Sequence, residues 1–251
     1  MTVDARLTRR RLLGGSAVVT GGALLGPLAG PLPVTSAQMV PRLYTRAAWQ
    51  ARPPKVAATV LERGPDRIVV HHTATANAAD TSREHAFSLS RSIQKFHMGT
   101  RGWEDAGQQL TISRGGYLME GRNSTFRAVN AGAHVVGTHT LGHNDHTIGI
   151  ENEGTYMTEG PTVELWDTLV ATCTWLCTVY RLNPHTAIVG HRDYNKTACP
   201  GDVLYARLPR LRNAVADSLD IRRVTEKTPT TPSGLPGPRY TFDHGPAASL
   251  R

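Results

Sequence analysis

Cysteine is scarce in this sequence, with three residues among 251. Two of them, Cys173 and Cys177, stand four residues apart in a stretch with helical periodicity. At that spacing their Cβ atoms should lie about 5–6 Å apart, which is longer than the roughly 3.5–4.5 Å of a disulfide. We therefore expect both thiols to pack in a core, with a strained disulfide or a redox role as the alternative. Cys199 is left without an obvious disulfide partner.

Several features that mark other classes of protein are missing. The sequence has no internal repeat, no helix-turn-helix or zinc-finger pattern, and no series of stacking aromatic residues. Acidic residues are few, 20 against 28 basic ones, which gives a formal net charge of +8. A basic balance favours anionic partners such as nucleic acid or wall polymers, or reflects only a solvated surface. The missing motifs argue against nucleic acid.

The first 37 residues lack a long uninterrupted apolar run. They read MTVDARLTRRRLLGGSAVVTGGALLGPLAGPLPVTSA, a basic cluster followed by an apolar stretch broken by glycine. Such a stretch is too short for a comfortable membrane span and indicates a targeting segment. Residues 8–13, TRRRLL, resemble a twin-arginine signal, and an N-terminal membrane anchor is the alternative. Cleavage near Ala37 would release a secreted or cell-wall-associated protein without a stable membrane span.

The other end of the chain lacks apolar periodicity. Residues 224–251 are rich in proline, glycine, threonine and serine, and such a composition buries too little surface to offset the entropy of ordering. We predict a disordered tail there. The remaining residues, 38–223, have the length of one domain with its own core, which we expect to be a monomer.

Strands and helices are mixed along this domain. Strands are predicted at 67–72, 147–154 and 186–191, with a hairpin formed by 108–113 and 117–122. Helices are predicted at 82–98, 161–182 and 203–219, with Pro161 in the first turn of the second. This mixture predicts an α/β fold in which about three main helices pack on a central sheet.

Cys199 stands eight residues after His191 in the segment GHRDYNKTACPGD, residues 190–202. The two could be a nucleophile and its base, two metal ligands, or residues that only pack. A nucleophilic cysteine usually opens a helix after a glycine-rich turn, and Pro200 removes the next backbone N–H donor. The HRD triplet resembles a kinase catalytic loop, but no glycine-rich phosphate loop accompanies it.

Metal ligation makes fewer demands on this segment. A catalytic zinc needs three protein ligands and an open position, and His191 and Cys199 supply two. The third ligand should come from the end of another strand, such as VVHH at 69–72. Neighbouring strand residues point to opposite faces, so only one of His71 and His72 can reach the metal. Core packing remains the alternative.

Several separate motifs occur together in this sequence. They are RAAWQARPP, IVVHHTAT, GWEDAGQQLTISRGG, VNAGAHVVGTH, TIGIENEGTY and GHRDYNKTACPGD, in that order. Over residues 46–212 they resemble the type-2 N-acetylmuramoyl-L-alanine amidase and peptidoglycan recognition protein family. The resemblance implies a mixed sheet packed by helices, peptidoglycan as partner, and one Zn²⁺ per chain held by His71, His191 and Cys199.

One position departs from the family pattern. Active members of the recognition-protein branch carry a tyrosine after GW-x-D-x-G, where this sequence has Gln108, which can bind substrate through hydrogen bonds but cannot transfer a proton. TIGIENEG, however, resembles the GIE-x-EG strand of the AmpD-like branch, whose first glutamate is the acid/base. That residue is Glu151 here. Glu153 is the weaker candidate, and two solvated surface acids are the alternative.

The resemblance also indicates roles for three other residues. Thr197 matches a position beside the developing oxyanion, or else bonds its own loop. His134 matches a histidine near the substrate groove, and Trp103 either lines that groove or packs on the hairpin. Trp49 is expected to anchor the entering strand in the core. We expect only packing or surface roles for His72, His97, His139, His143, His146 and His185.

The sequence therefore predicts a secreted zinc amidase that hydrolyses the amide between the lactyl group of N-acetylmuramic acid and L-alanine. A module that holds zinc and binds peptidoglycan without cutting it is the first alternative. A cysteine hydrolase that uses Cys199 is the second.

Overall fold

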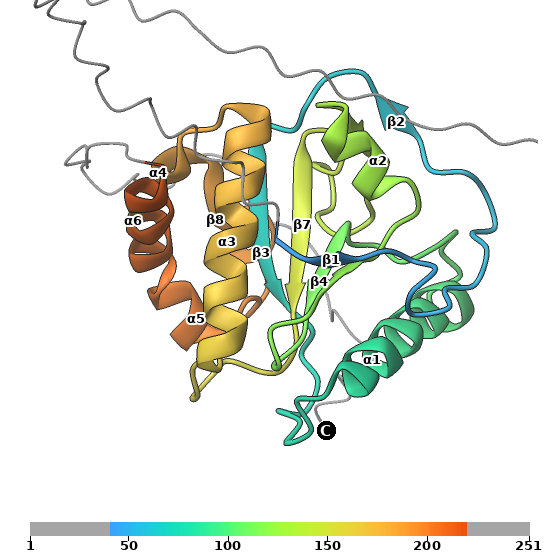
Figure 1. Cartoon of the computed structure of the whole chain (residues 1–251), viewed down its shortest axis with the longest axis horizontal. Coiled ribbons are helices and arrows are strands. Elements are labelled where there is room, and N and C mark those ends of the chain that lie inside the picture. Colours follow the sequence, from blue (N-terminus) through green and yellow to red (C-terminus); the bar gives the residue numbers. More distant parts are fainter. Residues whose placement is uncertain (1–40, 220–251) are drawn as a thin grey trace, which may run out of the picture. The chain divides into compact units, whose positions relative to one another are not determined.

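The computed structural model describes residues 41–219 of the chain (Figure 1). These residues fall inside the predicted domain 38–223, whose limits stay a prediction. The predicted export signal at 1–37 and the predicted tail at 224–251 lie outside the described residues. Among the helices described, none combines the length and the apolar character needed to cross a bilayer.

A six-stranded mixed sheet forms the centre, with the strand order β1-β5-β4-β7-β3-β8. Its strands are β1 (Leu43–Tyr44), β3 (Arg67–His72), β4 (Leu110–Ile112), β5 (Leu118–Glu120), β7 (Thr147–Asn152) and β8 (Ile188–Gly190). Strand β3 lies between β7 and β8 and is parallel to both, while β4 is parallel to β7 and antiparallel to β5. A separate antiparallel pair joins β2 (Val60–Leu61) and β6 (His134–Val135). The predicted hairpin and mixed sheet are confirmed.

Three long helices pack on this sheet, as predicted, together with shorter ones. The helices are α1 (Arg83–Lys95), α2 (Thr125–Asn130), α3 (Val163–Tyr180), α4 (Pro184–Ala187), α5 (Asp202–Ala206) and α6 (Leu208–Ser218), and a π-helical turn (Phe96–Thr100) extends α1. Both α1 and α3 begin at a hydroxyl residue that caps the first turn. The Ser82 and Thr162 side chains accept N–H groups three residues further on, at 3.1 and 3.3 Å.

One face of the sheet packs against α3, α5 and α6, with α3 in front of the strands in Figure 1. The buried side chains of this core include Ile68, Val70, Leu110, Ile112, Ile148 and Ile150 from the sheet and Leu165, Leu169, Leu176, Leu204, Leu211 and Val215 from the helices. Burying each such side chain is worth about 1.5–3 kcal/mol. Cys173 and Cys177 are buried here as free thiols, so the prediction that they pack in the core is confirmed.

The opposite face of the sheet is covered in two parts. At the β1–β5 end, Met119 packs with Trp49 and with Ala86 of α1. The indole of Trp49 is fully buried and donates to the Glu120 carbonyl at 2.9 Å, so its role as a core anchor is confirmed. Helix α1 lies away from β8 and α6 (Figure 1), which leaves the other end of this face to loops.

Several limits of these elements differ from the sequence prediction by a few residues. The predicted helix at 203–219 is split into α5 and α6 at Arg207, because Pro209 lacks the N–H that would bond back to Tyr205. The predicted start of α3 at Pro161 is also wrong, since Thr162 is the capping residue and the helix begins at Val163. Strand β7 ends at Asn152, two residues before the predicted limit.

Candidate active site

His71 stands at the carboxyl end of β3, in a row with two polar residues of the neighbouring strands. The register pairs His71 with Glu151 of β7, and Glu151 with Thr111 of β4. Paired residues project from the same face of a sheet, and here that face is the one opposite the α3 core. All three side chains are buried. Alternation therefore puts His71 beside Glu151 and turns His72 toward the other face.

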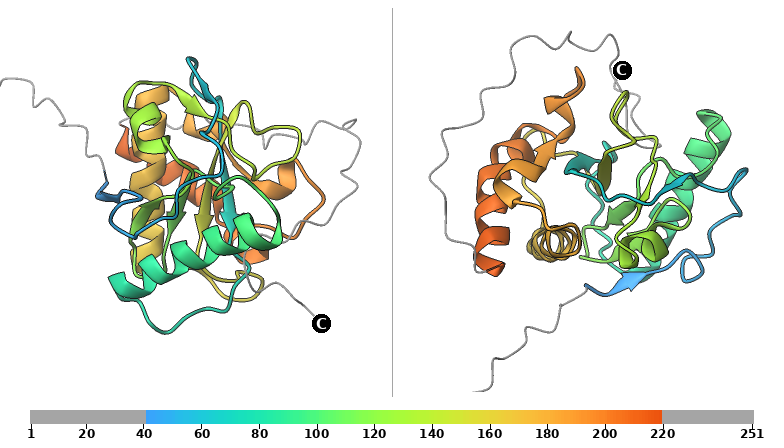
Figure 2. Two further views of the ribbon diagram at one scale, coloured as in Figure 1. Left: turned by 90° about the vertical axis from the view of Figure 1, so that its right-hand side faces the viewer. Right: turned by 90° about the horizontal axis from the view of Figure 1, so that it is seen from above.

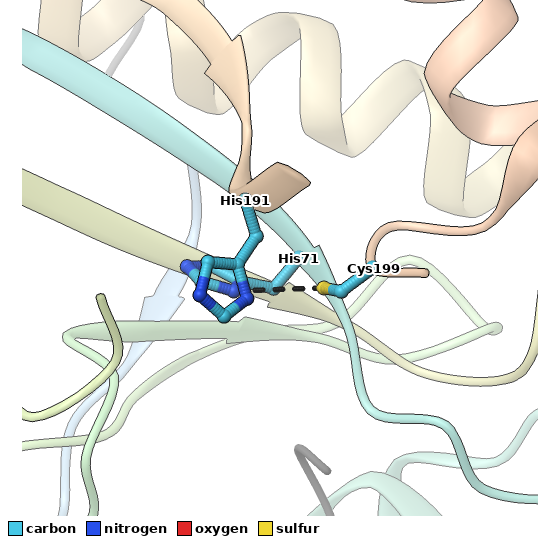
Figure 3. Close-up of side chains that lie close together, drawn as sticks. All are labelled: His71, His191 and Cys199. Carbon is cyan, nitrogen blue, oxygen red and sulfur yellow. Dashed lines mark hydrogen bonds between the residues drawn. The ribbon is translucent and has the colours of Figure 1, made fainter. Parts of the chain in front are cut away.

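His191 and Cys199 reach the same place from the segment that follows β8. His191 opens a short 3-10 helix (His191–Asp193) directly after β8, which runs parallel to β3. The loop then brings the Cys199 Sγ to 3.6 Å from Nδ1 of His71, and the two imidazole rings have centroids 4.6 Å apart. Figure 3 shows the three side chains converging, and their ligand atoms all lie within 4.8 Å of one another.

The environment of Cys199 distinguishes between a ligand and a nucleophile. Burial raises the pKa of the Cys199 thiol well above its usual value, and the negative charge of Glu151 adds to this, against the N–H of His72 and the charge of Arg192. A nucleophilic cysteine needs the opposite shift, whereas metal coordination itself removes the thiol proton. The His72 amide donates to Sγ at 3.3 Å, a contact suited to a thiolate. The geometry favours a ligand.

A hydrogen-bonded pair sets which nitrogen of His71 carries a proton. His139 Nε2 lies 3.2 Å from the carbonyl of Thr147, which can only accept, so His139 donates from Nε2. Its Nδ1 is then the acceptor, and it lies 3.0 Å from Nε2 of His71 and 2.8 Å from the hydroxyl of Thr140, which share this acceptor. His71 Nδ1, the nitrogen that faces Cys199, is left with its lone pair.

Asn195 does the same for His191. Its Oδ1 lies 2.9 Å from Nε2 of His191, and its Nδ2 donates to the carbonyl of Leu141 at 3.2 Å, which fixes the orientation of the amide. His191 therefore donates from Nε2 and keeps a lone pair on Nδ1. The loop between β6 and β7 and the loop after β8, which meet at this contact, lie on the side of the sheet away from α3 (Figure 2, right).

The chemistry of these donors fits zinc. Two imidazoles and one thiol, all buried, offer the nitrogen and sulfur ligands that Zn²⁺ binds in proteins. Each histidine has a hydrogen-bonded partner on its far nitrogen, which is the usual outer arrangement of a metal-binding histidine.

Neither glutamate of the TIGIENEG motif is a solvated surface acid. Glu151 and Glu153 are 2% and 1% exposed. Burial raises the pKa of the Glu151 carboxyl well above its ordinary value. Glu153 points elsewhere, since its carboxylate lies 2.5 Å from Nε2 of His85 and accepts the N–H of Arg114 at 2.7 Å. Glu151, paired with His71 in the sheet, is the carboxyl group beside the candidate metal ligands.

Comparison with known proteins agrees with this geometry. The profile of the family described as N-acetylmuramoyl-L-alanine amidase matches residues 61–202. The chain belongs to this amidase family. It is 34% identical over 167 residues to an N-acetylmuramoyl-L-alanine amidase of Homo sapiens, covering 66% of this chain but only 27% of that protein's length. It is 30% identical over 167 residues to peptidoglycan-recognition protein LB of Drosophila melanogaster, covering 66% and 67% of the two chains.

Solved structures of recognition proteins share the fold. A point mutant of Drosophila recognition protein LB, in complex with tracheal cytotoxin, superposes with a TM-score of 0.58 at 28% identity, covering 66% of this chain and 92% of the other. Drosophila recognition protein SD gives a TM-score of 0.59 at 27% identity, with coverages of 67% and 94%. The predicted family and the predicted fold are confirmed.

The amidase resemblance also indicated roles for Gln108 and Thr197. Gln108 contacts a strand that neighbours Glu151, and Thr197 stands two residues before Cys199. Gln108 is 2% exposed and its Nε2 donates to Thr111 Oγ1 at 2.9 Å, next to Glu151 in the register. Thr197 Oγ1 accepts the N–H of Cys199 at 3.1 Å, which is the local loop contact named as its alternative. Whether either residue contacts substrate stays a prediction.

The other two predicted substrate contacts are Trp103 and His134. Trp103 is half-buried and stacks on His97 with ring centroids 4.6 Å apart. His134 is 1% exposed and lies 2.9 Å from the carbonyl of Asn144, and burial lowers the pKa of its imidazole. Their substrate roles in this amidase family member stay predictions.

Sequence reasoning missed the outer partners of the metal ligands. His139 was assigned a packing or surface role, and Asn195 was not considered for the site. The glycine of the TIGIE motif, Gly149, was an indirect sign of His139. A Cβ added to Gly149 would lie 2.6 Å from Nδ1 of His139, so this glycine leaves room for an imidazole on the site's face of β7.

Proposed function

We propose that this protein is a zinc-dependent N-acetylmuramoyl-L-alanine amidase that hydrolyses the amide between the lactyl group of N-acetylmuramic acid and L-alanine in peptidoglycan. The observation that carries the proposal is the convergence of His71, His191 and Cys199 beside the Glu151 carboxyl group, in a chain of the amidase family. When bound by these ligands, zinc supplies a Lewis acid for the scissile carbonyl and a water molecule acidified toward neutral pH.

The protein's own residues supply proton transfer and orientation. Glu151 takes a proton from the attacking water and returns it to the leaving amine, as its position beside His71 allows. The Thr197 hydroxyl donates a hydrogen bond to the oxyanion of the tetrahedral intermediate. His134, Trp103 and Gln108 contact the substrate. His139 and Asn195 orient the two ligand histidines through contacts with their Nε2 atoms.

A peptidoglycan-binding module without hydrolytic activity is the second candidate. It is favoured by one observation, that the buried polar group beside Thr111 is the amide of Gln108, which cannot transfer a proton. A related structure of the recognition-protein group holds tracheal cytotoxin. In such a binding module, His71, His191 and Cys199 would hold zinc as part of the peptidoglycan-binding site.

Digestion of purified muropeptides by the full chain, followed by mass spectrometry, tests the proposal. An amidase releases free stem peptides that start with L-alanine, and a binding module retains the muropeptide intact. Cys199→Ala should lose both zinc and cleavage, whereas Cys177→Ala, the matched change in the helical core, should keep both. Full zinc retention by Cys199→Ala would place the metal elsewhere.

The proposal also puts the protein outside the cytoplasm, exported by the twin-arginine route. Its support is the sequence TRRRLL at 8–13, ahead of an apolar stretch. Replacing Arg9 and Arg10 with lysine should retain the protein in the cell. Unchanged secretion of that variant would show that another export route is used.

A further inference from the structure

A polar hollow lies between α1 and the segment that follows β1. It has a volume of about 200 Å³ and is lined by Gln50, Arg52, Ser88, Arg91, Ser92, Gln94 and Lys95. None of these residues belongs to the candidate active site. We call this set the basic hollow, since three of its seven residues are cations and none is acidic.

The basic hollow has fixed walls. Gln94 is 1% exposed and forms two hydrogen bonds with the backbone of Arg52, accepting its N–H at 2.9 Å and donating to its carbonyl at 3.0 Å. Arg91 donates to the carbonyl of Trp49 at 3.0 Å, and Trp49 is fully buried. Helix α1 and the incoming segment, which pass beside each other in Figure 2 (left), are thereby joined at this point.

The three cations have no anionic partner within the described residues. Arg52, Arg91 and Lys95 form none of the ion pairs found in residues 41–219. Arg91 and Lys95 are four residues apart on α1, where like charges repel and lower helix stability. Ser88 and Ser92 add hydroxyl donors to the same stripe of the helix. A bound anion would relieve this repulsion.

Size and composition narrow the choice of anion. Pockets for drug-sized ligands measure roughly 300–1,000 Å³, so this hollow takes one small group rather than a whole ligand. Guanidinium and ammonium donors suit phosphate. Nucleic acid is disfavoured because no aromatic side chain lines the hollow for base stacking. A membrane surface is disfavoured because no exposed large apolar residue lines it either.

We propose that the basic hollow binds a phosphate group of a polyol-phosphate polymer of the cell wall and so holds the protein beside its substrate. The proposal rests on the proposed function for the choice of the wall as the source of phosphate. In this proposal, three of the positive charges of the chain bind the phosphate group. The binding itself involves neither zinc nor any residue of the candidate active site.

Binding of the full chain to immobilised poly(glycerol phosphate) tests this proposal. The double variant Arg52→Gln/Lys95→Gln should weaken binding by about tenfold or more, as expected for loss of charge-assisted contacts. The matched control is Arg127→Gln/Arg210→Gln, which removes the same charge from exposed positions on α2 and α6 and should change the affinity less than about twofold if the contact is specific. Thermal unfolding checks that both variants fold.

Further arms of the experiment separate the outcomes. Vesicles containing phosphatidylglycerol and a single-stranded DNA of equal charge should bind more weakly than the polymer. If both double variants bind the polymer equally weakly, the effect depends only on net charge and the proposal is overturned. Tighter binding of the wild type to vesicles or to DNA than to the polymer would overturn it as well. Cleavage of soluble muropeptides should be the same in the Arg52→Gln/Lys95→Gln variant as in the wild type. A wild type that binds the polymer but cuts nothing would overturn the proposed function alone.

Discussion

The imidazole of His139 lies directly over Gly149 and contacts His71 of the neighbouring strand. Its Nδ1 is 3.0 Å from Nε2 of His71, and three of its ring atoms lie within 2.8 Å of where a Cβ on Gly149 would stand. Real contacts of that length do not occur, so glycine at this position and histidine at 139 depend on each other. Together they keep a hydrogen-bonding partner at Nε2 of His71, whose Nδ1 faces Cys199.

Gly149→Ala should therefore lower zinc affinity without touching a ligand. The new methyl group pushes His139 away from His71, and loss of such an outer partner typically costs about 10–100-fold in metal affinity. Competition with a chromophoric chelator measures the change. Gly99→Ala is the control, because nothing lies within 4 Å of a Cβ there. Equal zinc affinity in the Gly149 variant and the wild type would show that His139 does not position His71.

Asn195 offers a second test of the outer contacts, on the other histidine. Asn195→Ala removes both the acceptor for His191 Nε2–H and the donor to the Leu141 carbonyl, and zinc affinity should fall by about tenfold or more. Asn195→Asp keeps the acceptor, so it should retain more affinity than the alanine variant. Equal losses in the two variants would mean that the acceptor at His191 is not what matters.

The elements with a strong local signal were the ones that sequence could predict. The β-branched run before His71 gave β3, and the apolar stripe with Cys173 and Cys177 gave α3 to within two residues at each end. The split of the last helix was missed although Pro209 was visible, because the apolar spacing continues across it and outweighed the single residue. The hydrophobic pattern predicted where these elements lie in the sequence, but not which strands are neighbours in the sheet.

The site divides in the same way. Alternation predicts that only one of His71 and His72 can reach a metal. The structure places His71 in the cluster with His191 and Cys199. His139 was missed because it meets His71 across 68 positions of sequence, and no local pattern encodes that contact. Glu153 was the weaker candidate for the acid/base, and the structure pairs its carboxylate with His85, which is also 68 positions distant. Contacts of this kind follow from topology, not from spacing.

Glu151→Gln tests the proposed proton transfer. The change keeps the size and hydrogen-bonding capacity of the side chain but removes the proton-transfer group, so cleavage of muropeptides should fall by about 10²-fold or more. Zinc content and peptidoglycan binding should persist.

Glu153→Gln is the matched control, because Glu153 is equally buried but bonds His85 and the Arg114 N–H. This variant should lose thermal stability rather than turnover. If Glu151→Gln cleaves as fast as the wild type, another group transfers the proton.

His134 should make the stability of the fold depend on pH. Burial lowers the pKa of its imidazole, so below the unfolded-state pKa of about 6.5 the unfolded chain binds a proton that the folded chain does not. This contribution to stability is present above that pKa and is lost as pH falls toward the lower folded pKa. Between pH 7.5 and 5.5 it amounts to at most about 1.4 kcal/mol in the free energy of unfolding.

Urea unfolding of the wild type and of His134→Gln at these two pH values measures the contribution. Both proteins should be freed of metal with a chelator, because zinc binding to the folded state would add its own pH dependence. Glutamine can still donate to the carbonyl of Asn144, which His134 contacts at 2.9 Å, but it does not titrate. The wild type should therefore lose more stability than the variant on acidification, while the other histidines contribute equally to both. If the two proteins lose the same free energy, His134 takes up a proton as readily in the fold as in the unfolded chain, and its burial does not control its charge.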